Sequence, residues 1–180
     1  MADQEPPLTP LERLRRVFIT GHSCVRNFAY YRAARSADTA ALPLEHRDVK
    51  ARITNNFLDI GVLEWCKLFV ANERHAWDRL IPQADRDKFT ADLLTHLGIN
   101  QAGWTAYIDE FRTYRDKFLA HLDSNRTMHP PKLDLAIEAV LFYASHLQQT
   151  HAESKDIHPA DMDLRRSFET AQKAGAEYFR

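Results

Sequence analysis

The sequence predicts an all-α protein, an up-and-down bundle of four long helices with additional shorter helices, and three observations lead to that class. Apolar residues recur at intervals of three and four along most of the 180-residue chain, as on one face of an α-helix. No stretch alternates between apolar and polar residues for long enough to form a strand. Only 5 residues are glycine, whereas phosphate-binding loops and multi-hairpin folds need glycine where φ is positive. We expect residues 1–180 to form one helical domain.

The first two predicted helices carry the clearest patterns. The first begins at Pro10, with Thr9 as its N-cap, and runs to about Ala37. Gly21 lies on its apolar stripe, where a glycine allows another helix to pack closely. The second helix, from about Glu45 to Asn72, is apolar on more than one face and is expected to be the most buried helix. Its apolar residues are Val49, Ile53, Phe57, Leu58, Ile60, Val62, Leu63, Trp65, Leu68 and Phe69.

The second half of the chain predicts four further helices. After an irregular segment that contains Trp77, a short helix runs from about Ala84 to Leu97 and ends at Gly98 as its C-cap. The other three are expected over residues 101–122, 133–151 and 161–179, with a break at residues 123–131 that contains Pro130 and Pro131.

Composition limits the class of protein. Cys24 and Cys66 are the only cysteines, and their places in helical patterns predict reduced core residues. No stretch approaches the roughly 20 apolar residues of a membrane span, and the N-terminus is acidic where a signal peptide is basic. We therefore expect a cytoplasmic protein without a membrane partner. A net charge of −1 gives no overall attraction to nucleic acid.

One segment departs from this neutral balance. Between Leu11 and Arg35, six arginines stand against the single acid Glu12. They are Arg13, Arg15, Arg16, Arg26, Arg32 and Arg35. Such a basic stripe can follow nucleic-acid phosphates, and it can equally be a solvated helix face whose arginine stems cover apolar neighbours. The sequence leaves both interpretations open.

The helix predicted from Gln101 carries a charged residue on its apolar side. At about 100° per residue, Arg115 falls near the middle of a stripe made by Trp104, Ile108, Phe111, Phe118 and Leu122. An arginine in that position needs a partner. One interpretation is a buried ion pair with Glu64 of the second helix. The other is that the stripe opens onto a cleft where Arg115 binds an anion, with His121 about 9 Å further along the helix.

These residues carry a family resemblance. The segment Tyr114–Asp123, YRDKFLAHLD, resembles the signature of the HEPN superfamily (higher eukaryotes and prokaryotes nucleotide-binding domains). That signature is an arginine, usually followed by a polar residue, and a histidine after four to six residues; Arg115, Asp116 and His121 fill these positions. The residue sequence of this segment is most similar to that of HEPN proteins linked to abortive infection of phage-infected bacteria. Some members carry a tyrosine two residues after the histidine as a nucleotidylation target; Asp123 stands there, so that regulation is not expected.

The resemblance implies metal-independent RNA cleavage that uses no cofactor. His121 would act as general base or acid, Arg115 would hold the phosphate, and Asp116 would orient its neighbours by hydrogen bonding. The residues expected to contact RNA are Lys117, Arg126 and Arg112.

The resemblance also implies partners. We expect RNA rather than DNA, a second copy of the chain that contacts the helix from Trp104 to Leu122, and an antitoxin or other defence protein. Because the superfamily includes members that bind without cutting, the alternative is a catalytically inactive helical dimer that serves as a protein-interaction or RNA-binding module.

Overall fold

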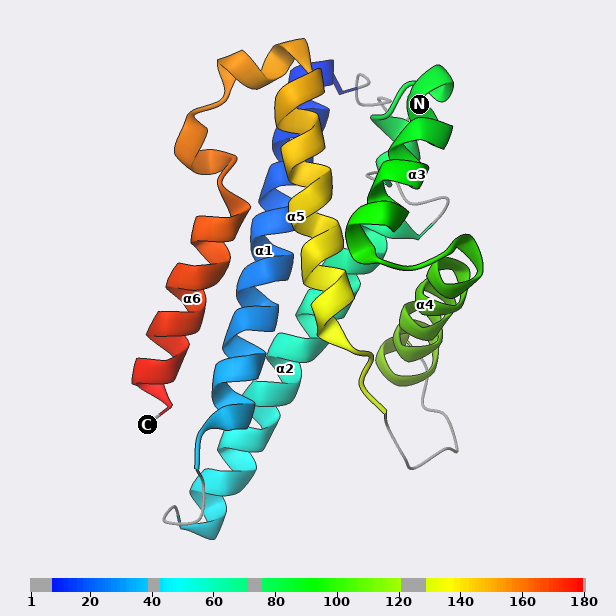
Figure 1. The fold of residues 1–180 in the computed structure, drawn as a ribbon. Helices are drawn as coiled ribbons and strands as arrows, with labels where there is room; N and C mark the ends of the chain where they lie inside the picture. The colour runs from blue at the N-terminus through cyan, green and yellow to red at the C-terminus, as the bar shows by residue number, and fades with distance from the viewer. Residues whose placement is uncertain (1–7, 39–42, 71–75, 121–128, 180) are drawn as a thin grey trace, which may run out of the picture.

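The computed structural model describes residues 8–38, 43–70, 76–120 and 129–179, and these ranges confirm the all-α class. They contain six α-helices and no strand (Figure 1). The α-helices are α1 (Pro10–Ser36), α2 (Leu44–Phe69), α3 (Arg86–Leu97), α4 (Gln101–Tyr114), α5 (Leu133–Thr150) and α6 (Leu164–Tyr178). A π-helical turn, η3 (Arg115–Ala120), follows α4, and 3₁₀ turns form at Trp77–Arg79, Gln83–Asp85, Ala152–Asp156 and Pro159–Asp161.

The helix ends follow local chemistry that the sequence predicts. The Thr9 hydroxyl accepts the backbone N–H of Glu12 at 3.2 Å, and the Glu12 carboxylate accepts the N–H of Thr9 at 2.8 Å, so a capping box opens α1. Gly98 ends α3 with a φ of 65°, a conformation that favours glycine. Asn100 then caps α4 by accepting the N–H of Gly103 at 2.8 Å.

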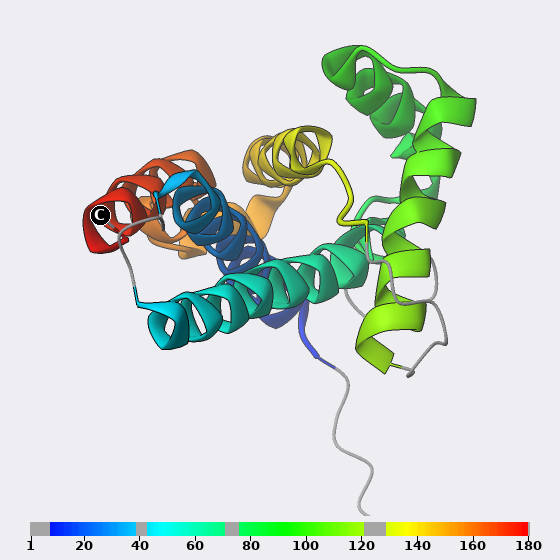
Figure 2. The same cartoon turned by 90° about the horizontal axis from the view of Figure 1, so that it is seen from below.

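The helices form two groups, one of α1, α5 and α6 and the other of α3 and α4 (Figures 1 and 2). Helices α1, α5 and α6 lie side by side, α2 runs along α1, and α3 and α4 lie beyond α5 (Figures 1 and 2). Close packing of α6 on α1 depends on Gly21, because a Cβ there would lie 2.6 Å from Leu164 Cδ2. The predicted role of Gly21 is confirmed. Cys24 and Cys66 are buried in the core and form no disulfide, also as predicted.

The prediction that the second helix is the most buried one is wrong. The side of α2 that carries Leu58, Val62 and Trp65 is buried. The opposite side lies at the lower edge of the molecule in Figure 2, and its apolar side chains are exposed. Apolar spacing shows that a helix has two apolar faces, but it does not show whether the same chain covers both. In the described ranges, no helix combines the length and apolar character needed to cross a membrane.

The predicted helix over residues 101–122 is corrected as well. Regular α-helix ends at Tyr114, and the backbone continues as the π-helical turn η3. A π-helix closes its hydrogen bonds five residues apart, so the spacing that defined the apolar stripe does not continue beyond Tyr114. The other predicted helices begin and end within three residues of the observed ones.

Candidate functional site

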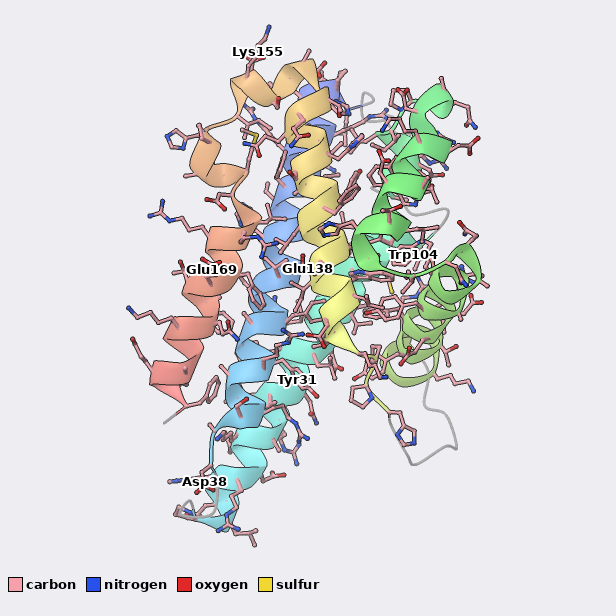
Figure 3. The ribbon with its side chains drawn as sticks, viewed as in Figure 1. Tyr31, Asp38, Trp104, Glu138, Lys155 and Glu169 are labelled. Atoms are coloured by element: carbon pink, nitrogen blue, oxygen red, sulfur yellow. The ribbon has the colours of Figure 1, made fainter. Side chains whose placement is uncertain are left out.

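An aromatic cluster fixes the position of α4. Trp65 of α2 is fully buried, and its ring centroid lies 4.1 Å from that of Phe111. Trp104 reaches from α4 to Trp65 and Phe69, with centroids 5.8 and 5.7 Å away (Figure 3). Tyr107 completes the cluster, 5.7 Å from Trp65. This packing buries Trp104 and Phe111 of the apolar stripe inside the chain, leaves Ile108 half-buried, and orients the C-terminal end of α4.

A hydrogen bond ties that end of α4 to the middle of α2. The Tyr114 hydroxyl donates to Asp59 Oδ1 at 2.8 Å. Burial raises the pKa of the Asp59 carboxyl, and the bond from Tyr114 opposes that shift. Burial and the bond to Asp59 both raise the pKa of the Tyr114 hydroxyl. Sequence reasoning missed this pair, although a carboxylate between Leu58 and Ile60 in an apolar segment was a signal for it.

Arg115 and Asp116 come together where the π-helical turn begins. Arg115 Nε donates to Asp116 Oδ1 at 2.8 Å, and the two side chains are 22% and 48% exposed. A charge-assisted hydrogen bond of this kind restricts the orientation of the guanidinium group. Solvent therefore reaches an arginine whose orientation is restricted by the neighbouring Asp116.

The expected ion pair between Arg115 and Glu64 is absent from the described residues. Glu64 instead pairs with Lys67, one turn further along α2, with Nζ 3.0 Å from Oε2. Glu64 is half-buried, and its ion-pair partner is a lysine on the same helix rather than Arg115 of the neighbouring segment.

Some of the other predicted site residues lie outside the described ranges, and the rest lie on α4 and η3. His121 and Arg126 lie outside the described residues, as do Leu122 and the side chain of Phe118. Lys117 is exposed on η3. Arg112 pairs with Asp109, with Nη1 2.8 Å from Oδ1. The structure thus joins Arg115 to Asp116 and leaves the geometry of the arginine–histidine pair untested.

The basic stripe of α1 is partly used within the chain. Arg13 donates to the carbonyl of Leu8, Arg15 donates to the carbonyl of Asp156, and Arg32 pairs with Asp134. Arg16, Arg26 and Arg35 are exposed. Three of the six arginines therefore bind groups of the same chain. For these three, a structural role on the helix surface is favoured over contact with nucleic-acid phosphates.

A separate hollow lies beside α1, and Arg115 does not line it. It has a volume of about 780 Å³ and is bordered by α1, by Phe57 of α2 and by residues 156–161. His22 Nε2 donates to the carbonyl of Asp161 at 2.8 Å and so helps to hold that wall. A hollow of this size with apolar and polar sides is suited to a small molecule, and sequence reasoning did not identify it.

Comparisons with protein-family models, with curated proteins and with solved structures find no match for this chain. The function therefore has to be argued from the residues and geometry of the chain itself.

Proposed function

We propose that this chain is a metal-independent endoribonuclease of the HEPN type, built on a HEPN-like helical bundle, that acts in phage defence or in a toxin–antitoxin system. Arg115 binds the scissile phosphate, Asp116 orients Arg115, and His121 transfers protons. Lys117 and Arg126 contact the RNA on either side.

One observation carries the proposal: Arg115 and Asp116 are hydrogen-bonded at the start of a π-helical turn. π-helical turns interrupt α-helices rarely and occur frequently at functional sites. Arg115 stays partly exposed, and Glu64, its expected structural partner, is engaged by Lys67. An arginine that is fixed in direction and reached by solvent suits the binding of a phosphate.

The chemistry follows from the two side chains. Neutral His121 takes the proton of a ribose 2′-hydroxyl, whose oxygen attacks the adjacent phosphorus. The bond from phosphorus to the 5′-oxygen breaks, leaving a 2′,3′-cyclic phosphate. The departing 5′-oxygen takes up one proton from solvent and becomes a hydroxyl, and the His121 imidazolium releases one proton to solvent. Arg115 stabilises the charge that develops on the phosphorane oxygens.

The direct test is cleavage of single-stranded RNA by the purified full chain in EDTA. We expect cleavage to persist, and Arg115→Ala and His121→Ala each to reduce its rate by at least about 100-fold. The matched control is Arg79→Ala, which removes an exposed arginine outside the basic stripe of α1 and should leave the rate unchanged. An oligonucleotide of the same sequence that lacks 2′-hydroxyls should remain intact. Activity that needs an added divalent ion would contradict the mechanism.

A stability measurement separates a catalytic from a structural role for Arg115. If Arg115 binds phosphate, Arg115→Ala should change the free energy of unfolding by less than about 1 kcal/mol, because a charge placed for ligand binding is commonly held at some cost to the fold. If it were half of a buried pair, its loss would cost about 3–5 kcal/mol. Urea denaturation of the wild-type chain and of Arg115→Ala distinguishes the two.

A second candidate function is favoured by the exposed apolar side of α2. A helical module that associates through that side, without catalysis, needs neither Arg115 nor His121. Wild-type protein that binds several RNAs or a protein partner but cuts no RNA would support this alternative.

A further inference from the structure

The outward side of α2 carries a regular row of exposed apolar side chains. Val49, Ile53, Ile60 and Leu63 are 54%, 37%, 42% and 38% exposed. Asn56 stands between Ile53 and Ile60, and Lys67 follows Leu63. With these two residues included, the row advances by four, three, four, three and four residues. We call these six residues the outer stripe. This repeat defines the contact line of a two-helix coiled coil.

The rest of the described chain leaves the outer stripe uncovered. Helix α1 packs on the other side of α2, where Gly61 contacts Phe28. Figure 2 shows α1, α5 and α6 on that side, and α4 near the C-terminal end of α2. The solvated face of a helix in a monomer is normally polar, so apolar residues in coiled-coil spacing indicate a missing helix.

The apolar stripe of α4 is not available for this role. Trp104 and Phe111 are buried against Trp65 of the same chain. The expected contact of two copies through the helix from Trp104 to Leu122 would have to compete with that packing. The outer stripe of α2 requires no such rearrangement.

We propose that two copies of this chain associate through the outer stripe, with their α2 helices antiparallel. One register satisfies all six positions. Val49 faces Lys67 of the second copy, Ile53 faces Leu63, Asn56 faces Ile60, and a two-fold axis repeats each contact in reverse. The association does not depend on the proposed nuclease activity.

Charge and polarity favour this register over a parallel one. A parallel, in-register pair would place Lys67 against Lys67 and Asn56 against Asn56. In the antiparallel pair, Lys67 lies beside Val49 instead, and its ammonium group keeps its ion pair with Glu64 of the same chain. The antiparallel register therefore avoids both of these contacts between identical polar residues.

The first test measures the mass of the full chain by sedimentation equilibrium from about 1 to about 100 µM, a range in which a reversible dimer changes its population. We expect a dimer whose dissociation constant rises at least about 30-fold in Ile60→Asp, because a central apolar contact dominates an interface. The matched control is Ile19→Asp, which charges an isoleucine of α1 that is 68% exposed and lies outside the outer stripe. It should dimerise like the wild type. A monomeric wild type, or equal losses in both variants, would overturn the proposal.

The second test determines the register with introduced cysteines. In the antiparallel pair, Ile53 of one copy faces Leu63 of the other. The two Ile53 residues of the dimer are therefore offset by ten residues, or about 15 Å along the helix axis, and the same holds for the two Leu63 residues. A mixture of Ile53→Cys and Leu63→Cys chains should therefore form intermolecular disulfides on mild oxidation, and neither variant alone should do so. Cys24 and Cys66 are buried and remain in place. Self-linking of Ile53→Cys alone would overturn the antiparallel register.

Discussion

Helix α2 makes its two main contacts in different ways. Against α1 it approaches closely at a glycine: Cys24 of α1 donates a weak hydrogen bond to the Gly61 carbonyl, with Sγ and O 3.5 Å apart, and the Phe28 ring occupies the space where a side chain would be. Against α4 it uses large rings around Trp65 and the hydrogen bond between Tyr114 and Asp59. The first contact depends on the absence of atoms and the second on their volume. Opposite substitutions should therefore disrupt them.

The largest effect is expected at the aromatic contact. Trp65→Ala should lower the free energy of unfolding by about 3–5 kcal/mol, because it removes a fully buried ring and leaves a cavity beside Phe111. Urea denaturation measures this loss. Trp77→Ala is the control: Trp77 is half-buried, so its removal should cost less. Equal losses in the two variants would show that the cluster does not specifically hold α4.

The glycine contact should respond to added rather than removed volume. Gly61→Ala should cost about 1–3 kcal/mol, since its Cβ would lie 2.5 Å from two ring carbons of Phe28, which is itself fully buried. Gly103→Ala places the same methyl group near the start of α4, where the nearest atom is 3.4 Å away. There a helix gains roughly 0.5–1 kcal/mol from alanine. Thermal unfolding of both variants tests the contrast, and a stabilised Gly61→Ala would refute the close fit.

The sequence predicts those features of the molecule that depend on residues close together in the chain. The stripe with Gly21, the cap at Thr9 and the end at Gly98 depend on local spacing and chemistry, and the structure confirms them. The aromatic stripe of α4 was predicted as far as Phe111, because helical spacing holds up to Tyr114.

The sequence does not predict the features that depend on hydrogen-bond patterns and on contacts between distant residues, because apolar spacing does not determine them. The π-helical turn at Arg115 is a change of hydrogen-bond pattern within a segment whose residues all suit an α-helix. The bond between Tyr114 and Asp59 joins residues 55 positions apart. Glu64 pairs with Lys67 of its own helix rather than with Arg115, a choice that the spacing did not decide. The arrangement of Arg115 and His121 stays a prediction.

The hydrogen bond at the end of α4 gives a smaller prediction. Tyr114→Phe keeps the ring and removes the hydroxyl, so Asp59 loses a donor while its carboxylate stays half-buried. We expect a loss of about 1 kcal/mol, at the low end for bonds to charged groups because solvent reaches this carboxylate. Chemical denaturation at neutral pH measures it. A loss as large as that of Trp65→Ala would mean that the bond, not the ring cluster, fixes α4.

The smallest effect concerns the charge of Asp59 itself. Burial raises the pKa of this carboxyl, so the folded chain binds the proton more tightly than the unfolded chain does. The resulting stability is fully present below the ordinary pKa of 3.8 and is lost as the pH rises through the raised value. At pH 7 the ionised carboxylate therefore lowers the stability of the fold.

Asp59→Asn removes that charge and keeps an oxygen that accepts the Tyr114 hydroxyl. The variant should be more stable than the wild type at pH 7 by a few tenths of a kcal/mol, with solvent screening limiting the gain. Denaturation midpoints of both chains between pH 4 and pH 7 test this, and the gain should shrink towards pH 4. A gain that grows as the pH falls would mean that the ionised carboxylate stabilises the junction of α2 and α4, and that its bond from Tyr114 outweighs its burial.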